Sequence, residues 1–246
     1  MALLTGKIAI VTGGSRGIGR AIAEQLAQDG ASVVINYRHR ADEAKEVVSV
    51  IEAEGRKALA MQADISQIAD IRRLFQETID FFGHLDILIN NAGSTAFKPL
   101  VEVTEGEFDV QFALNAKGTF FAMQEAARCM SDGGRIVNIS TLGTVNSAAG
   151  AGVYTGSKAA VEQFTMSAAK ELGGRGITVN AVSPGATLTE LFNKEAPPDV
   201  KALAAQLSPL GRMGQPQDIA DVVAFLVSEQ ARWITGQNIH ASGGAV

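Results

Sequence analysis

Tyr154 and Lys158 are the two side chains whose types and spacing most directly suggest chemistry. They lie four residues apart in a stretch with helical spacing, so both face the same side of a helix, one turn apart. A tyrosine hydroxyl has a pKa of about 10 in water, and a neighbouring ammonium group favours its phenolate form. The pair therefore predicts acid–base catalysis, although similar pairs also occur on ordinary helix surfaces.

Hydroxyl and amide side chains accompany two other apolar segments. Ser140 and Thr141 follow the apolar run 135–139, and in open α/β sheets ligands gather at the carboxyl ends of strands. Hydroxyls in that place can hydrogen-bond a substrate carbonyl. Asn115 lies in a long apolar helical pattern. Because a buried amide is costly without hydrogen-bond partners, we expect its side chain to hold a water or to stabilise a backbone distortion.

A glycine-rich turn follows the first apolar run. It reads Thr12-Gly13-Gly14-Ser15-Arg16-Gly17-Ile18-Gly19 and leads directly into a helical pattern. Glycine lets a backbone approach phosphate oxygens closely, and the next helix offers unpaired N–H groups. The turn therefore predicts a pyrophosphate site, although such turns also arise without ligands. It is not a P-loop, because no Gly-Lys-Ser/Thr follows, and its spacing departs from G-x-G-x-x-G.

The end of the second strand pattern distinguishes between the two nicotinamide cofactors. An Asp or Glu about 20 residues after the glycine turn would bind the ribose hydroxyls of NAD. This chain has Tyr37 and Arg38 there instead. Arg38 and Arg16 can pair with a 2′-phosphate, so we expect NADP(H); two solvated arginines are the alternative.

Apolar runs rich in Val and Ile alternate with longer stretches at helical spacing, as in βαβ units of a parallel sheet. The expected strands are Ile8–Thr12, Ser32–Tyr37, Lys57–Ala63, Leu85–Asn90, Gly134–Ser140, Ile177–Ser183 and Gln237–His240. The expected helices are Gly17–Asp29, Ala41–Glu54, Gln67–Phe82, Glu105–Met130, Val153–Leu172 and Gln215–Ser228. This alternation predicts a single-domain α/β Rossmann fold over residues 1–246, with a doubly wound, seven-stranded parallel sheet and helices on both faces. The segment Thr187–Gln215 is expected to be either a substrate lid or a surface excursion.

The composition excludes several classes of protein. Twenty-one basic and 26 acidic residues give a net charge of −5 without a basic run, which argues against nucleic-acid and anionic-membrane binding. No apolar run approaches the ~18 residues of a membrane span, and no signal peptide is readable, so a cytoplasmic location is expected. Cys129 is the only cysteine, so neither an internal disulfide nor a metal site is expected.

Together these motifs resemble the short-chain dehydrogenase/reductase family. They occur in that family's order: Thr12-Gly13-x-x-x-Gly17-x-Gly19, Asn90-Asn91-Ala92-Gly93, Asn115, Tyr154-x-x-x-Lys158 and Pro184-Gly185, then Gly211-Arg212-Met213-Gly214-Gln215-Pro216 and Ile234-Thr235-Gly236-Gln237. The resemblance covers essentially the whole chain. It is strongest to the 3-oxoacyl-carrier-protein reductases and the related ketone, glucose and naphthol reductases.

The resemblance implies NADPH-dependent reduction of a small-molecule ketone to an alcohol, usually by a homotetramer that packs its long helices between subunits. It makes Tyr154 the acid–base residue and Lys158 its partner, with Asn115 holding a water of a proton relay. Asn91 and Asp64 are implied near the adenosine, and Thr187 near the nicotinamide amide. The full set implied at the cofactor is Gly13, Ser15, Arg16, Gly17, Ile18, Gly19, Tyr37, Arg38, Asp64, Ile65, Asn91, Ala92, Gly93, Tyr154, Lys158, Pro184, Gly185 and Thr187.

One departure from the family pattern concerns the substrate-binding hydroxyl. The family's serine usually lies 13 residues before the tyrosine and seven after the glycine that opens the strand, and both counts reach Thr141. Members with a 14-residue spacing would select Ser140 instead. We expect Thr141, because its hydroxyl has the same donor and acceptor capacity as that of a serine.

The substrate is not identified by these patterns, and two other functions stay open. One is an NAD(P)-linked alcohol or sugar dehydrogenase that works oxidatively, and the other is a non-catalytic NADP-sensing protein. Arg128 and Arg175 are thin support for docking of a carrier protein. The expected apolar pocket is lined by Phe97, Leu100, Val145, Ala148, Leu191 and Phe192.

Overall fold

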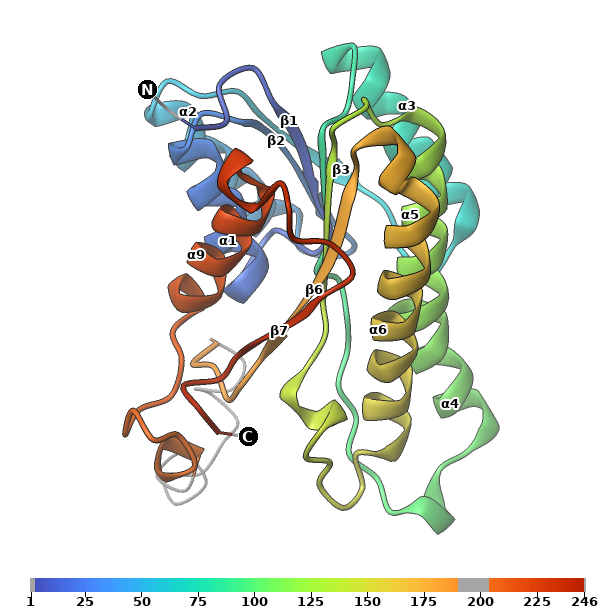
Figure 1. Cartoon of the computed structure of the whole chain (residues 1–246). Helices are drawn as coiled ribbons and strands as arrows, with labels where there is room; N and C mark the ends of the chain where they lie inside the picture. Colours follow the sequence, from blue (N-terminus) through green and yellow to red (C-terminus); the bar gives the residue numbers. More distant parts are fainter. Residues whose placement is uncertain (1–2, 190–203, 246) are drawn as a thin grey trace.

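A parallel sheet with helices on both faces forms the framework of the molecule (Figure 1). The computed structural model describes residues 3–189 and 204–245, and these residues contain seven strands. The strands are β1 (Ile8–Val11), β2 (Ser32–Tyr37), β3 (Ala58–Gln62), β4 (Ile87–Asn90), β5 (Arg135–Ile139), β6 (Thr178–Pro184) and β7 (Asn238–Ala241). Each predicted strand is confirmed to within two residues at its ends.

The helices form two layers around the sheet. They are α1 (Gly17–Gln28), α2 (Ala41–Ala53), α3 (Ile68–Phe82), α4 (Glu105–Phe112), α5 (Thr119–Cys129), α6 (Gly152–Leu172) and α9 (Pro216–Val227). In Figure 1, α1, α2 and α9 cover one face of the sheet, while α3, α5 and α6 cover the other. The predicted doubly wound arrangement is therefore confirmed.

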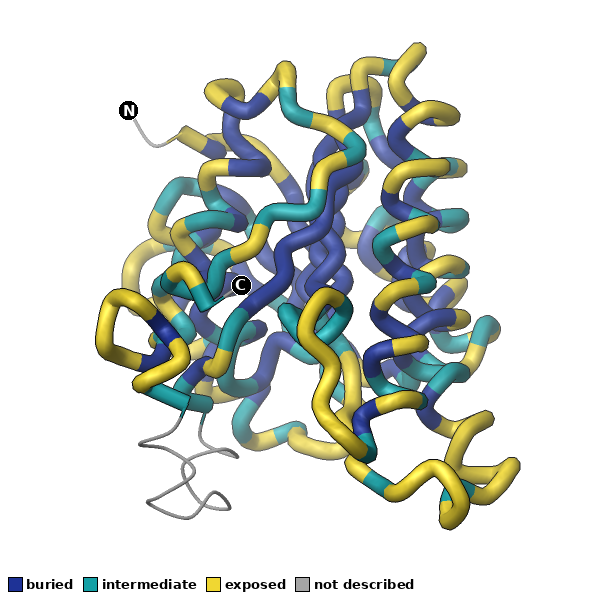
Figure 2. Tube along the Cα trace, turned by 60° about the horizontal axis from the view of Figure 1, so that its bottom comes forward, coloured by how far each residue is buried: buried dark blue, intermediate teal, exposed yellow. Residues whose placement is uncertain are grey.

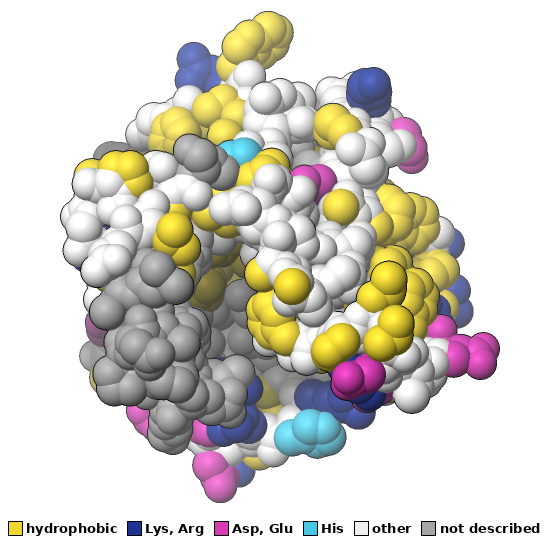
Figure 3. Space-filling model, turned by 90° about the horizontal axis from the view of Figure 1, so that it is seen from below, with side chains coloured by type: hydrophobic (Ala, Val, Ile, Leu, Met, Phe, Trp, Pro, Cys, Tyr) yellow, Lys and Arg dark blue, Asp and Glu magenta, His cyan; other side chains and the backbone are white. Residues whose placement is uncertain are grey.

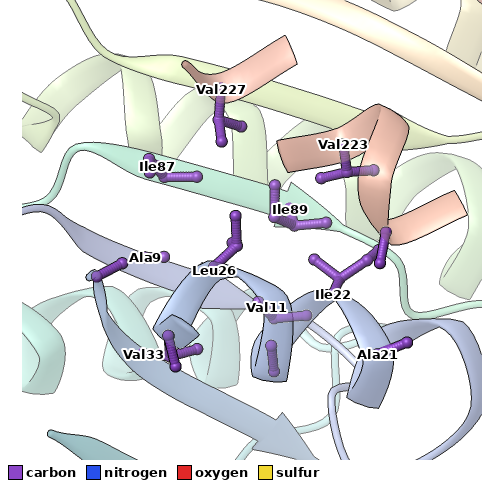
Figure 4. Packing of buried hydrophobic residues seen from close by; sticks show 14 of the residues in the cluster. Ala9, Val11, Ala21, Ile22, Leu26, Val33, Ile87, Ile89, Val223 and Val227 are labelled. Carbon is purple, nitrogen blue, oxygen red and sulfur yellow. The ribbon is translucent and has the colours of Figure 1, made fainter. Parts of the chain in front are cut away.

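Each face of the sheet has its own hydrophobic cluster, which explains why the strands read as continuous apolar runs. Ile22 and Leu26 of α1 point toward Ile89 of β4 in one cluster (Figure 4). In β1, Val11 belongs to that cluster and its neighbour Ile10 to the other. Burial of one such side chain contributes about 1.5–3 kcal/mol of transfer free energy. Figure 2 shows the result as a buried sheet beneath more exposed helix surfaces and loops.

The order of the strands decides where a ligand can bind. It runs β3-β2-β1-β4-β5-β6-β7, and every neighbouring pair is parallel. The chain therefore winds outward in one direction from β1 and in the other from β4. Connections that leave β1 and β4 on opposite faces open a crevice at their carboxyl ends. The glycine turn after Val11 and the segment Asn91–Gly93 after Asn90 both lie at that point.

The predicted helix Glu105–Met130 was wrong in one respect, because it is not α-helical throughout. The residues Ala113–Gly118 form a π-helical segment between α4 and α5. Asn115 lies inside this segment and is fully buried. Single π-helical turns often occur at functional sites, where they redirect side chains. The sequence analysis gave a backbone distortion as one reason for an asparagine at position 115, and the π-helical segment is such a distortion.

Among residues 3–189 and 204–245, no helix is both long and apolar enough to cross a membrane. The same residues hold no group of three or more His, Cys, Asp or Glu side chains arranged to bind a metal.

Candidate active site

The glycine turn between β1 and α1 leaves space that a larger residue would fill. Gly13 has a φ of +62°, which side chains with a Cβ rarely adopt. A Cβ on Gly19 would collide with the carbonyl oxygen of Gly13. Helix α1 begins after Arg16, whose side chain makes no capping hydrogen bond. Space beside the turn, the backbone N–H groups of the first helical turn and the positive end of the helix together fit a pyrophosphate.

Asn91 holds the glycine turn in place from the neighbouring strand. Its amide nitrogen donates to the carbonyl oxygens of Thr12 at 2.9 Å and Gly13 at 3.1 Å. The hydroxyl of Thr12 accepts hydrogen bonds from the backbone N–H groups of Asn91 and Ala92, at 2.9 and 3.0 Å. From the other side, Asn36 accepts from the N–H of Gly13 at 3.2 Å. The sequence reasoning missed Asn36, whose only signal is a polar residue in an apolar strand.

Other expected cofactor residues near the turn contribute to packing. Ser15 is buried, and Ile18 packs against the hydrophobic cluster beneath α1. Gly17 has a φ of +55°, at the first residue of α1. Tyr37 ends β2 and is partly buried on the same cluster.

Arg38 forms an ion pair with Asp64 at the end of β3. The Arg38 Nε and Asp64 Oδ2 atoms are 3.0 Å apart, and the arginine side chain is 55% exposed. The other oxygen of Asp64 accepts from the backbone N–H and the hydroxyl of Ser66, at 3.0 and 2.8 Å. The carboxylate is thus fixed while much of the guanidinium stays accessible. The next residue, Ile65, is buried, and its carbonyl oxygen leaves no room for a Cβ on Gly118.

Tyr154 lies in the first turn of α6 and contacts Thr141. Burial raises the pKa of the Tyr154 hydroxyl, and a hydrogen bond with the Thr141 side chain partly offsets that rise. Thr141 directly precedes the 3₁₀ turn Leu142–Thr144, where its hydroxyl also accepts from the N–H of Gly143 at 3.2 Å. The ring of Phe97 lies 6.4 Å from the Tyr154 ring, centroid to centroid.

Lys158 lies one helical turn after Tyr154 and is buried. Its ammonium nitrogen donates to the carbonyl oxygen of Ile139 at 2.7 Å. Burial lowers the pKa of Lys158 to about 8. A Cβ on Gly93 would lie 3.3 Å from both the Lys158 ammonium and the side-chain oxygen of Asn115. The close approach of Gly93 therefore brings the end of β4, the π-helical segment and α6 to one point.

Asn115 uses both hydrogens of its amide within the protein. The amide nitrogen donates to the carbonyl oxygen of Ser94 at 2.9 Å and to the hydroxyl of Ser157 at 3.0 Å. The amide oxygen accepts from the Ser94 N–H at 2.9 Å. These bonds join the segment after β4 to α6. The sequence reasoning did not find Ser94 or Ser157, because neither belongs to a recognisable pattern.

The hydroxyl of Ser140 is hydrogen-bonded to Glu162 and not to Tyr154. The Ser140 hydroxyl donates to Oε1 of Glu162 at 2.6 Å, and the residue is 3% exposed. Of the two candidate hydroxyls, that of Thr141 is the one that lowers the pKa of Tyr154. Glu162 is another residue that the sequence reasoning missed.

Pro184, Gly185 and Thr187 follow one another at the end of β6, beside the C-terminal segment. Gly185 donates to the carbonyl oxygen of Ala241 at 3.0 Å, and a Cβ on it would lie 2.9 Å from Ser242. Thr187 is buried, bonds to the Gly185 carbonyl at 2.9 Å and forms an isolated bridge with Gly214. The bridge joins the two ends of the predicted lid, of which residues 190–203 lie outside the described part of the chain.

A pocket of about 140 Å³ opens beside the Thr141 turn. Leu142 and Asn146 line it from that turn, Leu207 from the short segment 204–210, and Ser242 from the C-terminal segment. The predicted pocket residues are placed only in part. Phe97 lies beside Tyr154, whereas Leu100, which begins the 3₁₀ helix Leu100–Glu102, and Val145 and Ala148 are exposed. Leu191 and Phe192 lie outside the described residues.

The two arginines considered for carrier-protein docking are not at this site. Arg175 donates to the carbonyl oxygens of Ala127 and Met130 and pairs with Asp132. Arg128 pairs with Glu125. Arg175 precedes β6 and therefore lies at the amino end of the strands, whereas the site lies at their carboxyl ends.

Comparison with known proteins supports the same family along the whole chain. A family model described as enoyl-(acyl carrier protein) reductase matches residues 13–246. The chain is 44% identical to the short chain dehydrogenase/reductase nsrJ of Aspergillus novofumigatus, over 98% of this chain and 96% of that protein. It is 45% identical to the hydroxynaphthalene reductase-like protein Arp2 of Metarhizium brunneum, over 99% of this chain and 96% of Arp2.

Solved structures agree with the sequence relatives. The angucycline C-6 ketoreductase LanV with bound NADP superposes with a TM-score of 0.94 at 46% identity, covering 99% of this chain and 97% of LanV. LanV with bound NADP and rabelomycin gives a TM-score of 0.90 at 45% identity, covering 99% and 98%. The fold, the motif order and these relatives have one explanation: the chain belongs to the short-chain dehydrogenase/reductase family.

Proposed function

We propose that this protein reduces a ketone to a secondary alcohol with NADPH, using Tyr154 as the proton donor. The observation that carries the proposal is the placement of Tyr154 beside Thr141, whose side chain lowers the pKa of the tyrosine hydroxyl, and one helical turn before the buried Lys158. It brings two hydroxyls to one point, so that a substrate carbonyl oxygen can accept from both. Lys158, one turn further along α6, supplies a buried ammonium group.

The cofactor is NADP(H), as in the bound structures of LanV. The open glycine turn and the uncapped start of α1 fit its pyrophosphate. Arg38, fixed by Asp64 and still accessible, would hold the 2′-phosphate together with Arg16. When bound, the cofactor supplies the hydride that reduces the carbonyl carbon.

Tyr154 supplies the proton that the carbonyl oxygen needs. Burial raises the pKa of its hydroxyl, so the residue is protonated at neutral pH and can donate. Thr141 supports the same oxygen with a second hydrogen bond and holds the tyrosine in position. After transfer, the phenolate is stabilised by the Lys158 ammonium, which Ile139 orients.

Asn115 supports the site by joining two elements of the structure. Both amide hydrogens are donated to Ser94 and Ser157, so the side chain fixes the segment after β4 against α6. A water held for the proton relay would then bind another atom of the π-helical segment. The relay itself stays a prediction.

The apolar surroundings of the site favour an aromatic ketone. Phe97 lies next to Tyr154, and hydrophobic side chains gather on the face at which the strands end (Figure 3). Arp2 is described as hydroxynaphthalene reductase-like, and LanV binds rabelomycin. We therefore propose a ketone in or next to a fused aromatic ring system as the substrate, with Phe97 packing against its rings.

The predicted homotetramer also stays a proposal. Phe120 of α5 is 43% exposed and stacks edge-on against Phe164 of α6. A broad hollow lined by these two rings and by Phe112 of α4 lies beside them, at the π-helical segment. Such a surface suits packing of the long helices against a second subunit.

A turnover assay with the Tyr154→Phe variant tests the proposed function. NADPH consumption is followed with a panel of quinones, fused-ring ketones, acetoacetyl thioesters and sugars. We expect the variant to lose turnover with every substrate that the wild type reduces, while NADPH still quenches or shifts fluorescence at the same concentration. Unchanged turnover in Tyr154→Phe contradicts the proposal. Cofactor binding without consumption by the wild type indicates a sensing protein instead.

A further inference from the structure

One face of α6 contacts the end of β5 on both sides of Ser140. Lys158 donates to the carbonyl oxygen of Ile139, the last residue of β5. The side chain of Thr141, two residues further along the chain, interacts with Tyr154. Ser140 lies between these two contacts, so its conformation determines how Thr141 is presented to the tyrosine.

Glu162 makes the third contact on the same face of α6. It follows Lys158 by four residues, as Lys158 follows Tyr154, so the three side chains project from successive turns. Oε1 of Glu162 accepts from the hydroxyl of Ser140 at 2.6 Å. A hydrogen bond to a carboxylate of this length belongs to the strong class.

Ser140 is held through both its backbone and its side chain. Its N–H donates to the carbonyl oxygen of Val182 in β6 at 2.7 Å, and the residue is 3% exposed. The same oxygen of Glu162 lies 3.4 Å from the hydroxyl of Ser183, which in turn donates to Asn238 of β7 at 2.8 Å. Glu162 therefore ties α6 to the carboxyl ends of β5 and β6 at the residue that precedes Thr141.

We propose that Glu162 is a positioning residue for ketone reduction, which holds Ser140 and thereby orients the Thr141 hydroxyl toward Tyr154. The inference rests on the proposed function, because it concerns the same tyrosine and threonine. Glu162 itself acts only through Ser140 and Thr141. Its removal should therefore impair the chemical step and leave cofactor binding unchanged, since the glycine turn and Arg38 lie across the sheet at β1 and β2.

The first test compares Glu162→Ala with Glu162→Gln. We expect Glu162→Ala to lower kcat about tenfold through misplacement of the hydroxyl, with KM for NADPH unchanged. Glu162→Gln should recover most of kcat, because its amide oxygen can still accept from Ser140. Glu171→Ala is the matched control, since Glu171 accepts from Ser167 at 3.0 Å on the exposed part of the same helix. Wild-type kcat in Glu162→Ala would overturn the inference.

The second test asks whether the effect passes through Thr141. In a Thr141→Ala background, the added Glu162→Ala change should cause little further loss of kcat, because the two residues act as one unit. Full additivity of the two losses would overturn the inference. Ser140→Ala breaks the same hydrogen bond from the other side and should reproduce the kcat loss, which provides a measurement if Glu162→Ala does not fold.

The two proposals fail in different ways. If Tyr154→Phe retains turnover, the proposed function is wrong. If Tyr154→Phe and Thr141→Ala lose turnover but Glu162→Ala and Ser140→Ala keep wild-type kcat, only the positioning role of Glu162 is wrong.

Discussion

Lys158 donates a 2.7 Å hydrogen bond to the carbonyl oxygen of Ile139, which lies 19 residues earlier in the chain. The bond places a buried ammonium group at the end of β5, close to the residues that would receive the substrate. An ammonium group in that environment loses its proton more easily than one in water, and burial lowers the pKa of Lys158 to about 8.

The pH dependence of turnover should follow this lysine. The ammonium form predominates below about pH 8 and is lost above it. We expect kcat for ketone reduction to fall as pH rises through this value, because the neutral amine no longer stabilises the Tyr154 phenolate. A pH profile measured with saturating NADPH checks the expectation. A kcat that stays constant to pH 10 would contradict it.

Stability provides an independent measure of the same pKa. Lys158 has a lower pKa in the folded state, so between about 8 and the ordinary lysine value of 10.5 the unfolded chain binds more protons. The free energy of unfolding should therefore gain from this residue as pH rises through that window, and the burial penalty is fully present below it. The Lys158→Met variant has no ionisable group at this position, so its stability lacks this contribution. Melting curves of both proteins at pH 7 and pH 10 should show the wild type gaining stability relative to the variant.

Thr141 and Ser140 should differ in their effect on turnover. Thr141→Ala removes a hydroxyl that contacts Tyr154, and loss of one hydrogen-bond donor at a developing charge costs about 100-fold or more in kcat. Ser140→Ala removes only the bond to Glu162 and should cost about tenfold. Thr141→Ser is the control and should retain most activity. A larger loss in Ser140→Ala than in Thr141→Ala would show that the hydroxyl is wrongly assigned.

Arg38 should determine the preference between cofactors. Arg38→Leu removes a charge that would pair with the 2′-phosphate, and we expect KM for NADPH to rise about tenfold or more. The KM for NADH should stay nearly unchanged. Arg40→Leu is the control, because Arg40 pairs with Glu43 instead of Asp64. Equal changes in both KM values for Arg38→Leu would place the 2′-phosphate elsewhere.

Gly19 should tolerate no larger residue. In Gly19→Ala, the added Cβ would collide with the Gly13 carbonyl and the Asn91 amide, so the glycine turn has to move. We expect weaker NADPH binding and a lower Tm. Gly106→Ala is the control, since no atom lies within 4 Å of its added Cβ in α4. Fluorescence titration and thermal melting measure both effects, and wild-type affinity in Gly19→Ala would refute the close fit of the turn.

Much of the fold could be predicted because it follows from local patterns. Runs such as Ile8–Val11 are apolar at every position, since both faces of the sheet are covered. Helix boundaries were harder to predict inside the stretch 105–130. The sequence pattern is helical over the whole stretch, whereas the π-helical turn contains Asn115, whose amide bonds to Ser94 and Ser157 of other elements, and such contacts cannot be seen in a local pattern.

The sequence by itself determined the order of the elements, the glycine turn and the pairing of Tyr154 with Lys158 on one helical face. These are properties of neighbouring residues, so spacing is enough to find them. Only the tertiary structure decided which hydroxyl meets the tyrosine. Ser140 and Thr141 are adjacent in sequence, but β5 packs against α6 so that Ser140 bonds to Glu162 and Thr141 interacts with Tyr154. Such contacts join residues many positions apart, and their geometry exists only once the strand and helix are in contact.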